Sequence, residues 1–182
     1  MDKKYKCGLY IGRFQPIHIG HESIIRKMLE ECDQVIIAIG SAQESGTERN
    51  PFTFGQRADF ITNVFYRERL SGQMIVMPLD DRENPSNDAS WGDYVFKSVY
   101  AWCRACPDVI YEGEEKERNS WYDNLDVDVV KVPRSLIRVS ATLVRQLLES
   151  TIPSYEIWEV IPKAIHYRIP EMREVVKYGN KN

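Results

Sequence analysis

Two histidines three positions apart give this sequence its clearest chemical signal. His18 and His21 lie in the stretch GRFQPIHIGHESII, on either side of Gly20, and they are two of only three histidines in 182 residues. Imidazoles at this spacing can donate hydrogen bonds to an anion, ligate a metal ion, or pack as ordinary loop and helix-cap residues. Taken alone, the spacing favours packing, so the choice depends on the surrounding residues.

The neighbours of the pair favour phosphate binding. Arg13 supplies a cationic donor, and Gly12 and Gly20 let backbone approach a ligand closely. Gly20 is also predicted to open a helix, whose N-terminus attracts anions. Neither GxxxxGK[ST] nor GxGxxG is present. No cysteine or carboxylate stands at a spacing that would complete a zinc site with the histidines.

The elements that position these residues alternate between strand and helix periodicity. The pattern predicts strands at residues 7–12, 35–40, 74–79, 109–113 and 127–133, with helices over residues 20–32, 54–70, 94–102 and 140–150. Residues 82–92 are polar and turn-rich and predict a loop of functional length. We therefore expect an α/β fold with a doubly wound, Rossmann-like parallel sheet of about five strands. Ligands of such sheets bind at the carboxyl ends of the strands.

One domain over residues 1–182 is expected, with a core at about 5–150 and a short C-terminal helical extension at about 151–182. The net charge of −3 argues against non-specific nucleic-acid binding. No apolar run is long enough to span a bilayer, and the N-terminus does not resemble a signal peptide. The four cysteines are expected to be free thiols in a protein of the reducing cytoplasm. Cys103 and Cys106 form a lone CxxC, which we interpret as a helix end rather than a metal or redox pair.

Five blocks, in order, resemble the nucleotidyltransferase superfamily that carries an HxGH signature. GRFQPIHIGH is followed by IGSAQ at 39–43, NPFTFGQR at 50–57, NDASW at 87–91 and VSATLVR at 139–145. The prefix GRFQP is similar to that of archaeal-type nicotinamide-mononucleotide (NMN) adenylyltransferases. VSAT and residues 113–122 resemble the subgroup fused to a Nudix hydrolase, although Glu114 stands where that subgroup has histidine. The chain shows no Nudix helix pattern, so a second hydrolase activity is not expected.

The resemblance implies transfer of an adenylyl group from ATP to NMN, which forms NAD and pyrophosphate. It implies catalytic roles for His18, His21 and Arg145. For ATP and its phosphates it implies contacts from two segments: Gly12, Arg13, Phe14 and Gly20 in the first, and Gly113, Ser140 and Thr142 nearer the C-terminus. Magnesium would arrive with ATP, held mainly by phosphates and water, so no dedicated carboxylate cage is expected.

The NMN side is expected to comprise Ser41, Gln43, Arg57, Asp80, Asn87 and Trp91. Trp91 would stack on the nicotinamide ring from a polar loop; the alternative is a tryptophan that starts the following helix and is buried beneath it. Arg57 would bind a substrate phosphate, or else be a surface helix residue.

Two other functions remain open from the sequence. One is another adenylyltransferase of the superfamily, with pantetheine phosphate or FMN as acceptor. The other is a non-catalytic nucleotide-binding sensor, against which the intact His18, His21, Ser140 and Arg145 argue. Relatives of this type are often oligomers, so a homo-oligomer is a candidate assembly. The choice between nicotinamide and nicotinate mononucleotide is left open.

Overall fold

A five-stranded parallel sheet forms the centre of the protein in the computed structural model, which describes residues 2–82, 88–113, 121–133, 139–151 and 154–179. The strands are β1 (Tyr5–Gly12), β2 (Cys32–Ile39), β3 (Met74–Pro78), β4 (Val109–Gly113) and β5 (Asp128–Val132). Their order is β3-β2-β1-β4-β5, and every neighbouring pair is parallel. The predicted doubly wound α/β fold is thus confirmed. The chain reverses its winding direction between β1 and β4, where such sheets open a crevice for ligands.

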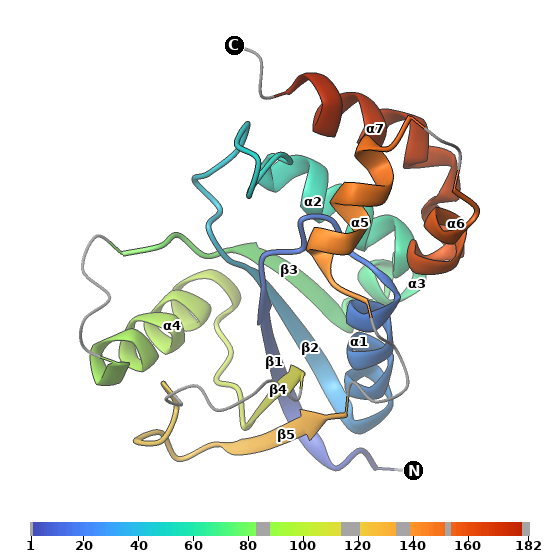
Figure 1. The fold of residues 1–182 in the computed structure, drawn as a ribbon. Coiled ribbons are helices and arrows are strands. Elements are labelled where there is room, and N and C mark those ends of the chain that lie inside the picture. Colours follow the sequence, from blue (N-terminus) through green and yellow to red (C-terminus); the bar gives the residue numbers. More distant parts are fainter. Residues whose placement is uncertain (1, 83–87, 114–120, 134–138, 152–153, 180–182) are drawn as a thin grey trace.

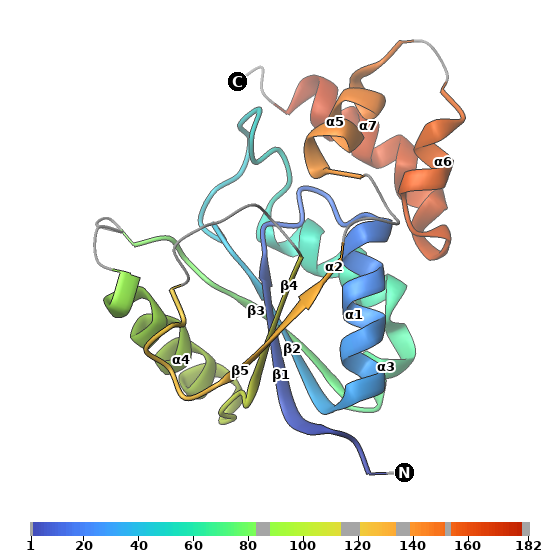
Figure 2. The same cartoon turned by 60° about the horizontal axis from the view of Figure 1, so that its bottom comes forward.

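Helices cover both faces of the sheet (Figures 1 and 2). One face carries α1 (Ile19–Glu31), α2 (Phe54–Val64) and α3 (Tyr66–Leu70), and the other carries α4 (Asp88–Cys103). The side chains of β1 alternate accordingly: Tyr10 packs in the cluster with α1, whereas Cys7 and Leu9 pack in the cluster with α4. Burial on both faces explains the nearly continuous apolar run of β2.

Two helical predictions need correction. The helix expected over residues 54–70 is divided at Phe65, whose backbone leaves helical geometry (φ −116°, ψ 44°) while its side chain is fully buried. The loop expected over residues 82–92 ends earlier, because α4 begins at Asp88 and includes Trp91. Trp91, Tyr94 and Val95 all pack on the cluster beside β3, so tertiary packing outweighs the turn-like composition of this segment.

The C-terminal residues form the expected helical extension, which consists of α5 (Ala141–Glu149), α6 (Glu156–Val160), the 3₁₀ helix η1 (Lys163–Arg168) and α7 (Ile169–Tyr178). Apolar side chains of these helices belong to the same core cluster as α1 and α2. Arg168 also pairs with Asp59 of α2 at 2.6 Å, and Tyr167 donates to Asn63. The extension therefore connects α5 to α2, because α7 and α6 pack on α5 while η1 packs on α2 (Figure 1).

The remaining sequence expectations concern cysteines and membrane spans. All four cysteines are free, and α4 ends at Cys103, as the interpretation of the CxxC as a helix end requires. Within the described residues, no helix has the length and apolar character needed to cross a bilayer.

Candidate active site

The predicted site residues come together beyond the carboxyl ends of the strands. Gly12 ends β1, and the loop after it carries Arg13 and Phe14 into α1, which contains Gly20 and His21. Ser41 and Gln43 follow β2, Asp80 follows β3, and Gly113 ends β4. Ser140, Thr142 and Arg145 lie at the start of α5. Asn87 and Glu114 lie outside the described residues.

His18 and His21 cap α1 reciprocally. The N–H of His21 donates to Nδ1 of His18, and the N–H of His18 donates to Nδ1 of His21, both at 3.4 Å. An Nδ1 that accepts a hydrogen bond carries no proton, so each neutral ring holds its proton on Nε2. The rings stack with centroids 3.7 Å apart and planes 20° apart. The cap therefore fixes two imidazoles side by side, with both rings in the tautomer that donates from Nε2.

The surroundings of the two rings hold them in place. His18 is buried, and the Phe14 ring lies 4.7 Å from that of His21. A Cβ on Gly20 would come within 3.1 Å of both the His18 ring and a Val139 methyl group. Only glycine allows the His18 ring and the segment before α5 to approach α1 this closely.

Gln15 joins three segments of the site. Its side-chain amide donates to the carbonyl of Phe52 at 3.0 Å and accepts from the Phe52 N–H at 2.9 Å. Its own carbonyl accepts from Nη1 of Arg145 at 3.0 Å. The histidine loop, the NPFT segment and α5 are thus tied together at one buried residue.

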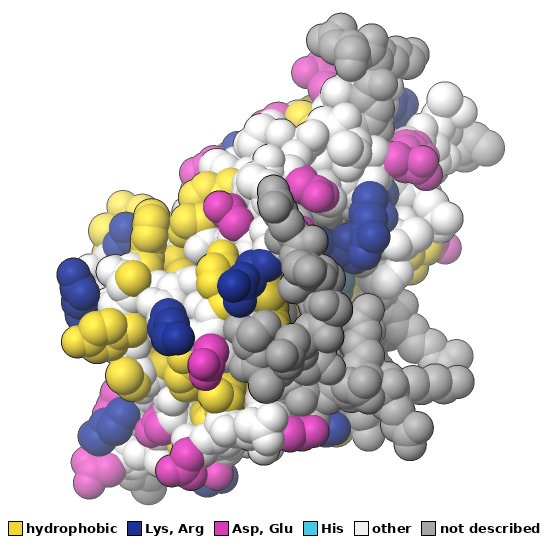
Figure 3. All heavy atoms as spheres, turned by 90° about the vertical axis from the view of Figure 1, so that its left-hand side faces the viewer, with side chains coloured by type: hydrophobic (Ala, Val, Ile, Leu, Met, Phe, Trp, Pro, Cys, Tyr) yellow, Lys and Arg dark blue, Asp and Glu magenta, His cyan; other side chains and the backbone are white. Residues whose placement is uncertain are grey.

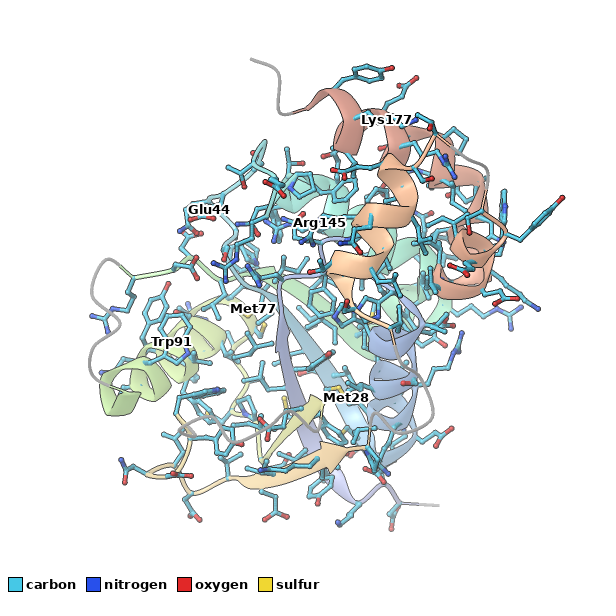
Figure 4. All side chains as sticks on the ribbon, viewed as in Figure 1. Met28, Glu44, Met77, Trp91, Arg145 and Lys177 are labelled. Atoms are coloured by element: carbon cyan, nitrogen blue, oxygen red, sulfur yellow. The ribbon has the colours of Figure 1, made fainter. Side chains whose placement is uncertain are left out.

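The side chains of Ser140 and Arg145 both form hydrogen bonds within the first turns of α5. The Ser140 Oγ accepts from the N–H of Leu143 at 3.2 Å, which confirms the predicted N-cap. Nη2 of Arg145 donates to Oγ1 of Thr142 at 3.4 Å. Figure 4 shows the Arg145 side chain extending from α5 toward the ends of the strands.

Cationic side chains and carboxylates both surround Arg145. Burial lowers the pKa of Arg145, the nearby cations Arg13 and Arg49 lower it further, and Glu149 and Glu48 partly offset this effect. Arg49 was not among the predicted residues, because it precedes NPFT in a polar stretch without periodicity; its proximity to Arg145 emerges only from the fold. Guanidinium groups gathered in this way are suited to binding the phosphates of a polyanion.

Arg57 occupies a different environment from the one predicted. Its side chain is fully buried, and burial followed by proximity to Arg13 lowers its pKa to about 10. The guanidinium donates to backbone carbonyls of the loops that follow β1 and β2. It is neither a surface helix residue nor placed like the exposed Arg13.

Three of the residues predicted for NMN, Trp91, Asp80 and Gln43, lie on the α4 side of the site. Trp91 is half-buried in the first turn of α4, with its ring 5.3 Å from that of Tyr94. Tyr94 in turn donates to the carbonyl of Asp80 at 3.0 Å, and the side chain of Gln43 accepts from the N–H of Asp81 at 3.1 Å. In Figure 4, Trp91 and Arg145 lie on opposite sides of the strand ends. Trp91 therefore lies on the α4 side of the strand ends, and Arg145 on the α5 side.

Comparisons with known proteins agree with this arrangement. The cytidylyltransferase-like family model matches residues 9–157. The nicotinamide-nucleotide adenylyltransferase of Thermococcus onnurineus is 32% identical over 172 residues, covering 93% of this chain and 85% of its own length. The enzyme of the same name from Pyrococcus furiosus is 32% identical over 173 residues, covering 93% and 86%.

A solved structure shares the fold. The bifunctional NMN adenylyltransferase/ADP ribose pyrophosphatase from Francisella tularensis, in complex with AMP and a manganese ion, superimposes with a TM-score of 0.68 at 24% identity. The match covers 95% of this chain and 52% of that longer protein. The resemblance inferred from the HxGH signature is confirmed: the chain belongs to the cytidylyltransferase-like family of nucleotidyltransferases.

Proposed function

We propose that this protein transfers the adenylyl group of ATP to NMN and thereby produces NAD and pyrophosphate. The observation that carries the proposal is the match to archaeal nicotinamide-nucleotide adenylyltransferases along nearly the whole chain. The geometry supports the same chemistry, because donors suited to phosphates converge where the loop after β1 meets α5.

The reaction makes modest demands on acid–base chemistry. The nucleophile is a phosphate oxygen of NMN, already anionic, so it needs no general base. The protein must instead hold two polyanions in line and stabilise the charge that grows on the departing pyrophosphate. Cationic groups and N–H donors perform that task, and these are the groups that the site supplies.

We assign the ATP side of the site to the histidine pair and α5. His18 and His21 donate from Nε2 to the ATP phosphates, with His21 directed at the oxygens that gain charge. The first turn of α5, which follows the N-cap Ser140 and includes Thr142, directs its N–H groups toward the β- and γ-phosphates. Arg145 adds a planar fork suited to phosphate oxygens. Arg13 contributes a further positive charge.

The remaining ATP contacts are assigned to backbone. Gly12 ends β1, and its carbonyl accepts from the N–H of Gly40 at 2.9 Å, which holds the first two strand ends together. Phe14 supports the His21 ring. We propose that the backbone of Gly12, Gly20 and Gly113 borders the bound nucleotide.

The NMN side is assigned to Ser41, Gln43, Asp80, Asn87 and Trp91. We propose that Trp91 stacks on the nicotinamide ring from the first turn of α4. Its position beside Tyr94 supports this assignment, because the ring is only half-buried and lies next to the strand ends. Stacking on a flat ring is a common use of tryptophan in binding sites.

We propose that the divalent ion of the reaction is Mg²⁺ and that it enters with ATP as part of the substrate. The AMP and manganese ion bound to the Francisella relative support a role for a divalent metal. Within the described residues, no cluster of three or more His, Cys, Asp or Glu side chains offers a metal cage. The phosphates of ATP and water then supply most of the ligands.

A panel of acceptors tests the proposal directly. Purified protein is incubated with ATP, Mg²⁺ and, separately, NMN, nicotinate mononucleotide, pantetheine phosphate or FMN, and both pyrophosphate and the dinucleotide are measured. NAD formation with NMN is expected. If only pantetheine phosphate or FMN is adenylylated and NMN is not, the assignment of NMN as acceptor is wrong. Nucleotide binding without turnover would favour the sensor function.

We also propose that residues 1–182 form one domain and that the protein self-associates. Continuity of the core between the sheet and the C-terminal helices supports the first statement. Apolar side chains exposed on α4, including Tyr100 and Trp102, support the second (Figure 3). Light scattering at several protein concentrations would measure the assembly, and a monomer throughout would refute it.

A further inference from the structure

Every N–H group of the buried Arg57 side chain is engaged by backbone. Nε donates to the carbonyl of Thr53 at 3.2 Å within α2. Nη1 and Nη2 donate to four further carbonyls, those of Arg13 (3.0 Å), Gly40 (2.8 Å), Ser41 (3.0 Å) and Glu44 (3.5 Å). A guanidinium has five N–H donors, so this set uses all of them. Arg57 has no N–H left with which to hold a substrate phosphate.

The carbonyls on Nη1 and Nη2 belong to the two turns that begin the site. Arg13 lies in the turn after β1, and the other three lie in the turn after β2. Each turn contains a non-glycine residue in the left-handed region: Phe14 has φ 50° and Ser41 has φ 48°. This conformation is costly for such residues and persists only where the surroundings enforce it. The Arg57 guanidinium donates to the carbonyl of Arg13, in the peptide that precedes Phe14, and to the carbonyl of Ser41 itself.

Arg57 forms no ion pair with a carboxylate among the described residues: all its hydrogen bonds go to backbone carbonyls, and the carboxylates of Asp81 and Glu44 act on its charge only from a distance. A lysine could not replace it, because an ammonium group has three donors and no planar fork. Arg57 is therefore a rigid, charged bridge between two turns that are 27 residues apart at Arg13 and Gly40.

We infer that Arg57 is a positioning residue of the adenylyl transfer: without touching either substrate, it holds the turn that leads to His18 in register with the turn that carries Ser41 and Gln43. The inference rests on the proposed function and deepens it, because it names the group that aligns the ATP half of the site with the NMN half. It replaces the expectation that Arg57 binds a substrate phosphate.

Steady-state kinetics of Arg57→Lys distinguish alignment from direct binding. If Arg57 aligns both turns, the variant raises KM for ATP and for NMN together and lowers kcat by about 10–10²-fold, the scale of a misplaced site. If Arg57 instead binds the NMN phosphate, KM for NMN rises while KM for ATP keeps its original value. The second pattern, or unchanged kinetics, would overturn the inference.

A matched variant separates alignment from general destabilisation. Ile61, one turn further along α2, is fully buried and apolar. Ile61→Ala weakens the same helix but removes no hydrogen bond from either turn, so its folded fraction should keep both KM values and kcat. Equal kinetic losses in the Ile61 and Arg57 variants would reduce Arg57 to a stability residue and overturn the inference.

Hydrogen exchange gives a readout that does not depend on activity. The amides of Gly40, Ala42 and Glu44 donate to Gly12, Leu79 and Ser41, respectively. Arg57→Lys should accelerate exchange in the peptide over residues 40–44 by tenfold or more, whereas Ile61→Ala should not single out this peptide. Unchanged protection there in the lysine variant would refute the bridge even if the unaltered protein makes no NAD, in which case the proposed function fails separately.

Chemical rescue covers the case in which the lysine variant does not fold. Arg57→Ala leaves a buried space of side-chain shape at the end of α2, which guanidinium ion can enter. Addition of guanidinium chloride at low millimolar concentration should restore activity and amide protection together, and sodium chloride at the same concentration should not. Equal effects of the two salts would contradict a specific role for the fork.

Discussion

A methyl group added at Gly20 tests how tightly the histidine pair is positioned. The Cβ of Gly20→Ala would lie 3.1 Å from Cε1 and Nδ1 of His18 and 3.1 Å from a methyl carbon of Val139. Contacts this short force the neighbours to move by a few tenths of an ångström. His18 is buried and stacked on His21, so its movement disturbs both rings.

The expected loss in kcat follows from these short distances. A misplacement of 1 Å costs a rate on the order of 10²-fold, so a shift of a few tenths of an ångström costs about five- to tenfold in kcat. Stability is expected to stay the same or fall moderately. Alanine gains about 0.5–1 kcal/mol over glycine in a helix, and the crowding costs about 1–3 kcal/mol. The net destabilisation of about 0–2.5 kcal/mol lowers Tm by up to about 10 °C for a chain of this size.

Gly55 offers a matched control. It occupies the second position of α2, as Gly20 does in α1, and each helix starts with a reciprocal capping box. A Cβ on Gly55 meets only Oγ1 of Thr53, at 3.9 Å, which is an ordinary contact. Gly55→Ala should therefore leave kcat unchanged and keep or raise Tm.

The assay is continuous NAD formation with both substrates saturating, alongside thermal unfolding of both variants. A Gly20→Ala protein with the parent kcat and an intact Tm would refute the reasoning. It would mean that the position of the His18 ring does not limit the reaction.

Three further predictions use the same site and core. His21→Ala should lower kcat by about 10²-fold, the scale for losing one preorganised donor to developing charge, and full turnover would contradict its assignment. Trp91→Ala should raise KM for NMN while sparing KM for ATP; equal changes in both would exclude stacking on nicotinamide. Burial raises the pKa of the Cys7 thiol to about 12, so this thiol stays protonated at pH 8. An aromatic disulfide reagent should then label the exposed Cys106 at once and Cys7 only on unfolding, as peptide mapping would reveal.

The sequence supports the fold prediction well where burial is simple. The apolar run of β2 and residues 109–113 of β4 match the predicted strands closely, because both faces of these strands are covered. The turn-like composition before Trp91 misled the prediction of α4, since packing on β3 extends that helix to Asp88. The break at Phe65 could not be seen in the apolar periodicity. A buried phenylalanine fits the inward face of a continuous helix, and Phe65 is also buried where the helix is broken.

The environments of the candidate site residues could be predicted where the residue types carry chemistry, and less so where they act through backbone. His18, His21 and Ser140 have recognisable spacing, and the structure places them at helix starts. Arg57 has the same residue type as a phosphate ligand, yet its partners are carbonyls from two distant turns. Long-range backbone partners leave no local pattern in a sequence, so this environment emerges only from the folded chain.

The hydrogen bond from Arg145 to the Gln15 carbonyl joins residues separated by 130 positions, and this separation affects how the protein matures. A ribosome delivers the histidine loop early and α5 late, together with the helices that anchor it. A nascent chain therefore cannot bring Arg145 to the histidine loop until α5 and the helices that pack on it have emerged. ATP then stabilises only the finished fold, by about 2.7 kcal/mol at a hundredfold excess over Kd, and so protects completed chains rather than intermediates from proteolysis.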